Sequence, residues 1–266
     1  MGYTSAGLKE ESCMLSPGME ELTKALIRLL ESDQLLKANK RQAQYLALQN
    51  QINPHFLYNT LDSIRSEAML EGNETVAEMT EALASFFRYT ISNVENMVTL
   101  EEELENTKVY FLIQKHRFED RVNLEIEYDK EDEFLLRCLL PKLTIQPVVE
   151  NSIIHGIERK VGSGLIRILL KCTEKRLIIE IKDDGVGMQP EVLEKLNQQL
   201  EQPVYESIQL SKEKGGIAIA NVNNRIHLIF GEEYGMTAYS TPNVGTDIII
   251  NLPLITSERQ IKDLKE

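Results

Sequence analysis

Four short segments hold the residues whose types and spacing could do chemistry, and the first of them is QINPHFLYN. Its proline is expected to restart a helix, on which His55 and Asn59 lie one turn apart, away from the apolar stripe of Leu57 and Leu61. His55 should therefore point outward. Because imidazole is largely neutral near pH 7, an exposed ring nitrogen can act as a nucleophile that two different partners can reach.

The second segment is QPVVENSIIHG, in which Asn151 and His155 lie one turn apart on an otherwise apolar helix. An amide oxygen suits Mg²⁺, and a histidine can lie beside a phosphate. Taken alone, however, the segment is better explained as a helix end with Gly156 as its C-cap.

The third segment, DDGVGM, follows a β-rich stretch directly. A carboxylate at a strand end, here Asp183, can accept a hydrogen bond from an exocyclic amine such as that of adenine. Gly185 and Gly187 would let the backbone turn sharply and come close to a flat ligand. The same pattern also occurs in many ordinary strand-to-loop turns, so its position among the other segments gives it weight.

The fourth segment begins with Gly215 and Gly216, whose amides would open a helix and face phosphate oxygens. The polar stretch 189–214 before it is expected to form a partly helical lid. With 29 Lys and Arg against 42 Asp and Glu, the net charge is −13, which argues against nucleic-acid or anionic-membrane binding. A phosphate would therefore be held locally, by amide dipoles and Mg²⁺ instead of a basic patch.

The composition indicates a cytoplasmic protein of two domains. The chain has 266 residues, of which 42% are hydrophobic, enough for a sizeable core. Three cysteines form no metal-binding or disulfide pattern, and no apolar run approaches the length that spans a membrane. We expect no membrane contact within this chain, although a transmembrane sensor could precede it.

Apolar spacing divides the chain into elements. A weak coiled-coil seam runs over 22–47, two amphipathic helices follow on either side of Gly72-Asn73, and a third helix starts at a Thr99 capping box. The helical pair is expected to form a four-helix bundle with a second chain. Beyond residue 120 the sequence alternates as strands do, with helices expected over 141–156 and 216–230, so the class is α+β.

These elements divide the chain into five expected parts. They are an unstructured start, native or engineered (1–19), a signalling helix (20–54), a dimerisation hairpin (55–119), a mixed α/β domain (120–254) and a tail (255–266).

The four segments, in this order, resemble the bacterial sensor histidine kinases of the YesM/LytS type. NPHFLYNTLDSI is similar to the phosphoacceptor motif of that family, LTIQPVVENSIIHGI to its N box, DDGVGM to its first glycine box, and GGIAIANVNNRI with FGEEYG to its second. The resemblance covers about residues 46–254. Four motifs in the family's order are far more specific than any one of them.

The resemblance implies a Bergerat-type α/β sandwich that binds ATP, preceded by a dimeric helical hairpin. It makes 55–119 the phosphoacceptor domain and 120–254 the ATP-binding domain. It implies that His55 is autophosphorylated, that Asn151 coordinates Mg²⁺ and that Asp183 binds adenine. Combined with the residue patterns above, it assigns the rest of the ATP site to His155, Gly185, Gly187, Gly215, Gly216 and Thr246.

The predicted function is that of a two-component sensor histidine kinase, which phosphorylates His55 with Mg-ATP and passes the phosphoryl group to an aspartate of a response regulator receiver domain. Two residues stand out: one departs from the usual second glycine box, and the other differs from the commoner histidine kinases, as it does throughout the YesM/LytS type. Ala218 replaces the second glycine of the last motif, and Phe56 stands where commoner histidine kinases carry an acid, so the general base is unassigned. The alternatives are an ATPase of the same fold that forms no phosphohistidine, and a non-catalytic dimeric scaffold.

Overall fold

The computed structural model describes residues 54–91, 97–118, 121–129, 133–201 and 217–263. The expected signalling helix over 20–54, except Pro54, lies outside these residues. So do Gly215, Gly216 and residues 202–214 of the expected lid. None of the described helices combines the length and apolar character that crossing a membrane requires.

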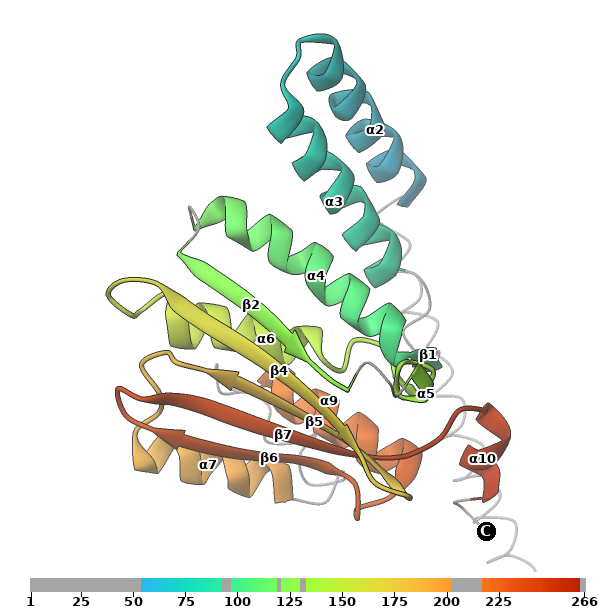
Figure 1. Cartoon of the computed structure of the whole chain (residues 1–266), viewed down its shortest axis with the longest axis vertical. Coiled ribbons are helices and arrows are strands. Elements are labelled where there is room, and N and C mark those ends of the chain that lie inside the picture. Colours follow the sequence, from blue (N-terminus) through green and yellow to red (C-terminus); the bar gives the residue numbers. More distant parts are fainter. Residues whose placement is uncertain (1–53, 92–96, 119–120, 130–132, 202–216, 264–266) are drawn as a thin grey trace, which may run out of the picture. The chain divides into compact units, whose positions relative to one another are not determined.

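Two helices form the hairpin that the apolar stripes predict. They are α2 (Pro54–Leu70) and α3 (Glu74–Ile91), which pack against each other (Figure 1). The turn between them uses Gly72, whose φ of +70° is favourable only for glycine and a few other residues. Asn73 then caps α3, because its side-chain oxygen accepts a hydrogen bond from the Val76 amide at 3.2 Å.

The buried face of α3 differs from the predicted stripe. The residues that α3 buries are small, namely Ala77, Thr80, Ala82 and Ala84. The apolar spacing of the sequence predicts a stripe of Val76, Met79, Leu83, Phe86, Phe87, Thr90 and Val94. Of its larger members, Met79, Leu83 and Phe87 are only half-buried. A partly exposed apolar band therefore runs along α3.

The next helix, α4 (Leu100–Arg117), starts at the predicted capping box. The Thr99 hydroxyl accepts a hydrogen bond from the Glu102 amide at 3.2 Å, and the Glu102 carboxylate accepts one from the Thr99 amide at 2.8 Å. This helix packs against α3, where the rings of Phe86 and Tyr110 are 5.7 Å apart between centroids.

Five strands make one mixed sheet in the order β2-β4-β5-β7-β6. Their bounds are β2 (Val122–Glu127), β4 (Gly164–Cys172), β5 (Arg176–Asp183), β6 (Gly235–Thr241) and β7 (Gly245–Pro253). Strands β2 and β4 are parallel and the other neighbours antiparallel. A separate antiparallel pair joins β1 (Met97–Thr99) to β3 (Leu139–Pro141).

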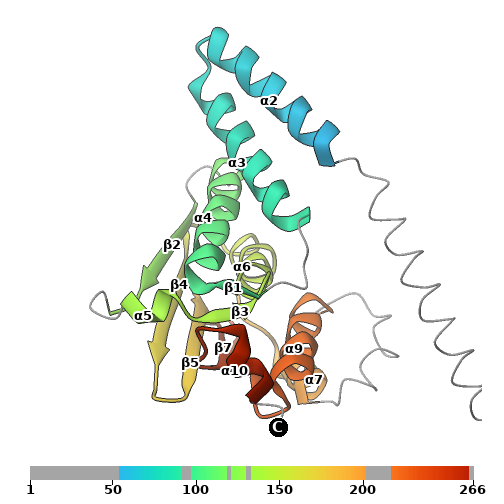
Figure 2. The ribbon, with the colours of Figure 1, turned by 90° about the vertical axis from the view of Figure 1, so that its right-hand side faces the viewer.

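Helices cover one face of the five-stranded sheet (Figures 1 and 2). They are α4, α6 (Gln146–Asn151), a π-helix that continues α6 (Ser152–Ile157), α7 (Pro190–Glu201) and α9 (Ile217–Phe230). Two short helices, α5 (Glu133–Leu136) and α10 (Glu258–Asp263), complete the described elements. The predicted α+β class, with a helical region before a mixed α/β domain, is confirmed.

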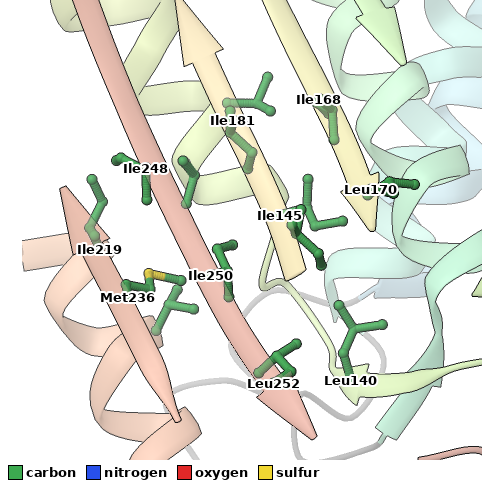
Figure 3. Close-up of a cluster of buried hydrophobic side chains, with 14 of the residues drawn as sticks. Leu140, Ile145, Ile168, Leu170, Ile181, Ile219, Met236, Ile248, Ile250 and Leu252 are labelled. Atoms are coloured by element: carbon green, nitrogen blue, oxygen red, sulfur yellow. The ribbon is translucent and has the colours of Figure 1, made fainter. Parts of the chain in front are cut away.

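The core lies between this sheet and the helices. Alternate residues of each strand point inward, so Ile168, Ile181 and Ile250 are buried together with Ile145 and Ile219 from the helical side (Figure 3). Their neighbours along the strands form charged pairs, such as Lys182 with Glu180, on the other face. This alternation explains why the strands can be recognised in the sequence.

The prediction of one continuous helix over 141–156 is wrong. In place of a single helix over 141–156, β3 ends at Pro141, a bend follows, and α6 begins only at Gln146. The segment then continues as a π-helix, so Gly156 lies inside it and is not a C-cap. Strand β6 is not among the elements that the sequence predicts.

Candidate active site

Asp183 lies at the end of β5, paired in register with Thr246 of the neighbouring β7. The residue is 8% exposed, and its carboxylate accepts a hydrogen bond from the Gly185 amide at 2.9 Å. Burial raises the pKa of this carboxyl, while hydrogen bonds from Gly185, Ser152 and Thr246 act in the opposite direction. The site thus holds a buried acceptor at a fixed position.

Glycines allow the backbone to close tightly around Asp183. A Cβ atom on Gly185 would lie 2.5 Å from the Gly156 Cα and 2.7 Å from Oδ1 of Asp183. Gly187 has φ +65°, and a Cβ there would lie 2.1 Å from the Thr241 carbonyl oxygen. The two glycines of the predicted DDGVGM motif are therefore required by close approach and by backbone conformation.

The helical segment formed by α6 and the π-helix carries Asn151 and His155 beside this turn. Asn151 is half-buried and His155 is exposed. The Val186 amide donates a hydrogen bond to the Gly156 carbonyl at 3.1 Å, which ties the π-helix to the glycine turn. π-helical turns inside α-helices frequently occur at functional sites.

A cavity of about 420 Å³ joins these elements. Five residues expected from the sequence line it, namely Asn151, His155, Asp183, Gly187 and Thr246. Residues that the sequence analysis missed complete the lining: Gly156, Arg159, Met188, Gln189, Val192, Lys195, Leu196, Gln199 and Ile219. A cavity of this size is in the range that holds a small ligand or cofactor.

The missed residues on α7 follow a helical spacing. Val192, Lys195, Leu196 and Gln199 stand at i, i+3, i+4 and i+7, so they share one face of α7. That spacing is visible in the sequence PEVLEKLNQQLE and could have identified the face. Lys195 and Arg159 also give the cavity two basic side chains, which the sequence analysis did not expect.

The chemistry of this lining fits a nucleotide. Asp183 can accept from an amine, Ile219 and Met188 offer apolar surface to a flat ring, and Arg159 and Lys195 suit an anion. Among the described residues, no group of three His, Cys, Asp or Glu could hold a metal. Mg²⁺ would instead need oxygen ligands from the phosphates and water, with the Asn151 amide oxygen as a protein ligand.

His55 lies apart from the cavity lining, near the start of α2, and its side chain is exposed as predicted. Nδ2 of Asn59, one turn further along, is 3.2 Å from Nδ1 of His55. The Asn59 amide thereby fixes the ring and leaves Nε2 on its other side. The predicted residues Gly215 and Gly216 are outside the described part of the chain.

Comparisons with known proteins identify the class. Residues 43–122 match the family described as Histidine kinase, and residues 140–256 match the family described as Histidine kinase-, DNA gyrase B-, and HSP90-like ATPase. The chain therefore belongs to the histidine kinase family and carries an ATPase-type domain of the second family.

Within that class, its relatives include sensor histidine kinases of the predicted type. YesM of Bacillus subtilis is 34% identical over 92% of this chain and 39% of YesM, and LytS of Oceanobacillus iheyensis is 32% identical over 82% of this chain and 36% of LytS. YwpD, a putative uncharacterized protein of Bacillus subtilis, is 31% identical over 82% of this chain and 73% of YwpD. The chain thus spans about two fifths of the length of YesM.

Solved structures add little to this relationship. The histidine kinase domain of the Erythrobacter litoralis EL346 blue-light activated histidine kinase aligns with 79% of this chain and 98% of its own, at 13% identity and a TM-score of 0.43. At that score the superposition carries no argument of its own.

Proposed function

We propose that ATP binds in the cavity beside Asp183, that it phosphorylates His55, and that the phosphoryl group then passes to an aspartate of a response regulator receiver domain. The observation that carries the proposal is the cavity itself, because it gathers five residues chosen from the sequence as an ATP site. The exposed histidine on α2 provides an acceptor within the same chain.

In the proposed complex the adenine amine donates to Asp183, and Thr246 contributes the neighbouring polar group. Their register across β5 and β7 sets the spacing between them. Asn151, His155, Arg159 and Lys195, which line the cavity, would face the phosphates. The contribution of the backbone amides of Gly215 and Gly216 stays a prediction from the sequence. A bound Mg²⁺ would neutralise phosphate charge, with Asn151 as its ligand from the protein.

The proposed reaction uses Nε2 of His55 as the nucleophile. The structure places Nδ2 of Asn59 against Nδ1 of His55. In the proposed step the Asn59 amide turns over, so that its oxygen accepts from a protonated Nδ1 and the lone pair on Nε2 attacks the γ-phosphorus in line. A nitrogen–phosphorus bond forms while the bond from the γ-phosphorus to the β–γ bridging oxygen breaks, and ADP leaves. The Nδ1 proton is then lost to water, which can reach the exposed ring.

The partly exposed band along α3 supports the further proposal of a homodimer. Met79, Leu83 and Phe87 are only half-buried in a single chain, so a second copy packed on this band would bury them. Four helices would then surround one apolar core.

Phosphate transfer can be tested directly with purified receiver domains. After incubation with γ-labelled ATP, label that moves from the chain to a receiver aspartate supports the proposal. Steady ATP turnover without label on the chain would favour the ATPase alternative. Failure to bind ATP by calorimetry would favour the non-catalytic scaffold.

A further inference from the structure

Glu103, one turn into α4, is fully buried and accepts four hydrogen bonds. Its Oε2 accepts from the backbone amides of Thr144 at 2.9 Å and Ile145 at 3.0 Å. Its Oε1 accepts from the Leu143 amide at 2.6 Å and from the Tyr89 hydroxyl at 2.5 Å. Three consecutive amides thus converge on one carboxylate, an arrangement of strong, charge-assisted hydrogen bonds.

These amides belong to the bend at residues 143–145. The bend leads directly into α6 and the π-helix, the helical segment that carries Asn151 and His155. Ile145 is the N-cap of α6, and Asn151 is the last residue of that helix. Leu143 has φ +57°, a left-handed conformation that a leucine rarely adopts. Arg225 of α9 also holds the bend, since it donates to the Leu143 carbonyl at 2.7 Å. The bend is therefore held by side chains from other elements, in addition to the Thr144 hydroxyl, which donates to the Pro141 carbonyl within the bend.

The C-terminal end of the same helical segment is held by a contact that does not involve Glu103. Gly156 accepts a hydrogen bond from the Val186 amide at 3.1 Å, close to Asp183. Near the start, Asn106 of α4 donates to the Gln146 side chain at 2.8 Å, which adds a second tie to α4. A disturbance at Glu103 should consequently move Asn151 more than the adenine end of the cavity.

The fourth hydrogen bond of Glu103 leads to the hairpin. Tyr89 lies in the last turn of α3, which packs against α2, the helix of His55. Burial raises the pKa of Tyr89, and the negative charge of Glu103 raises it further. The hydroxyl therefore stays protonated and acts as the hydrogen-bond donor to Glu103. Nζ of Lys142 lies 4.4 Å from the centroid of the Tyr89 ring. The hairpin and the bend thus meet at a buried, charged junction.

We infer that Glu103 is a positioning residue for the ATP site, which sets the start of the helix that carries Asn151, and that its hydrogen bond with Tyr89 couples this helix to the hairpin. Neither side chain lines the cavity. The coupling to the hairpin rests on the proposed function, because it is tested by phosphorylation of His55. The positioning role of Glu103 is tested by ATP binding alone and does not need that reaction.

The binding test measures ATP affinity of the full chain by calorimetry, with Mg²⁺ and with EDTA. Glu103→Gln places an amide N–H₂ against backbone donors, so we expect affinity with Mg²⁺ to fall by about tenfold and affinity in EDTA by less than about twofold. Combining Glu103→Gln with Asn151→Ala should add little to the loss caused by Asn151→Ala alone. Glu105→Gln, an exposed change on the same helix, is the matched control.

A less disruptive variant tests the coupling between the hairpin and α6, and it still decides this point if Glu103→Gln does not fold. Tyr89→Phe removes one hydroxyl and leaves the three amide bonds of Glu103 in place. We expect ATP affinity within about twofold of the wild type and His55 labelling slowed by about fivefold or more. The control is Tyr110→Phe, which keeps the ring contact with Phe86 between α3 and α4 and removes a hydroxyl that takes no part in the four hydrogen bonds of Glu103. It should leave both quantities unchanged.

Three results would overturn the inference. The first is a folded Glu103→Gln variant whose affinity with Mg²⁺ equals that of the wild type. The second is full additivity with Asn151→Ala, and the third is a normal labelling rate in Tyr89→Phe. A wild-type chain that never labels His55 would instead contradict the proposed function, and the calorimetric comparison would still decide the role of Glu103.

Discussion

Gly156 lies directly against the carboxylate of Asp183: a Cβ atom on Gly156 would stand 2.8 Å from Oδ1 and 3.2 Å from Cγ of that side chain. The π-helix and the end of β5 can approach this closely only because one of the two residues has no side chain. The relationship places the helical segment of Asn151 and His155 beside the buried acceptor.

Gly156→Ala should therefore weaken ATP binding. Alanine normally stabilises a helix relative to glycine, but here its methyl group must displace Asp183, so we expect a loss of about tenfold or more in affinity. Calorimetry with ATP and a thermal melt would measure both effects.

Gly72→Ala is the matched control for that variant. Nothing lies within 4 Å of a Cβ there, but φ is +70°, so alanine should lower stability without changing ATP affinity. Equal ATP affinity in Gly156→Ala and the wild type would contradict the proposed packing of the site.

The raised pKa of Asp183 predicts opposite effects of pH on folding and on binding. Its ordinary value is 3.8, and burial raises it in the folded chain. The folded state therefore holds this proton more tightly than the unfolded state, and the free energy of unfolding should decrease as pH rises from 3.8 through the folded pKa. ATP affinity should increase over the same window, because the ionised carboxylate is the better acceptor for the adenine amine.

Unfolding titrations and calorimetry at a series of pH values would measure these two curves. In Asp183→Asn, the changes with pH that this carboxyl causes in the free energy of unfolding and in ATP affinity should vanish. ATP affinity should be low at every pH. If the pH dependence of both curves survived in the variant, Asp183 would not be the titrating group that links them.

Asn59→Ala should slow phosphorylation of His55 without affecting ATP binding. The variant removes the amide that lies 3.2 Å from Nδ1 and orients the ring, and misplaced nucleophiles commonly lose about a hundredfold in rate. Both residues are exposed, so stability should change by no more than about 0.5 kcal/mol. Single-turnover labelling would give the rate.

Ser63→Ala is a suitable control for Asn59→Ala. Its hydroxyl donates to the Asn59 carbonyl at 2.8 Å, one turn further along α2, and does not reach the ring. A labelling rate in Asn59→Ala as high as in Ser63→Ala would show that the ring needs no orientation from Asn59.

The parts of the site that the sequence predicts are those with local causes. The strand before Asp183 alternates buried and half-buried residues, and Gly187 is required by its own backbone angle. The capping box at Thr99 needs only two residues three apart. Such features depend on nearest neighbours in the chain, so spacing reveals them.

The parts that it misses depend on distant contacts. The bend at residues 143–145 resembles the start of a helix in the sequence, because nothing local shows that Glu103, 40 residues earlier, captures its amides. Strand β6 buries only Met236 and Ala238, so its alternation is weak. Ser240 of this strand nevertheless donates to the Gly245 carbonyl at 2.8 Å and contacts the hydroxyl of Thr246. Tertiary pairing, and not local preference, determines both.

The central claim is that ATP in this cavity phosphorylates His55, and the most direct measurement is labelling of the intact chain with γ-labelled ATP. We predict a label that acid removes and alkali does not, absent from His55→Ala although that variant still binds ATP, and absent from Asn151→Ala although His55 is intact. Label of the same stability in His55→Ala would contradict the claim.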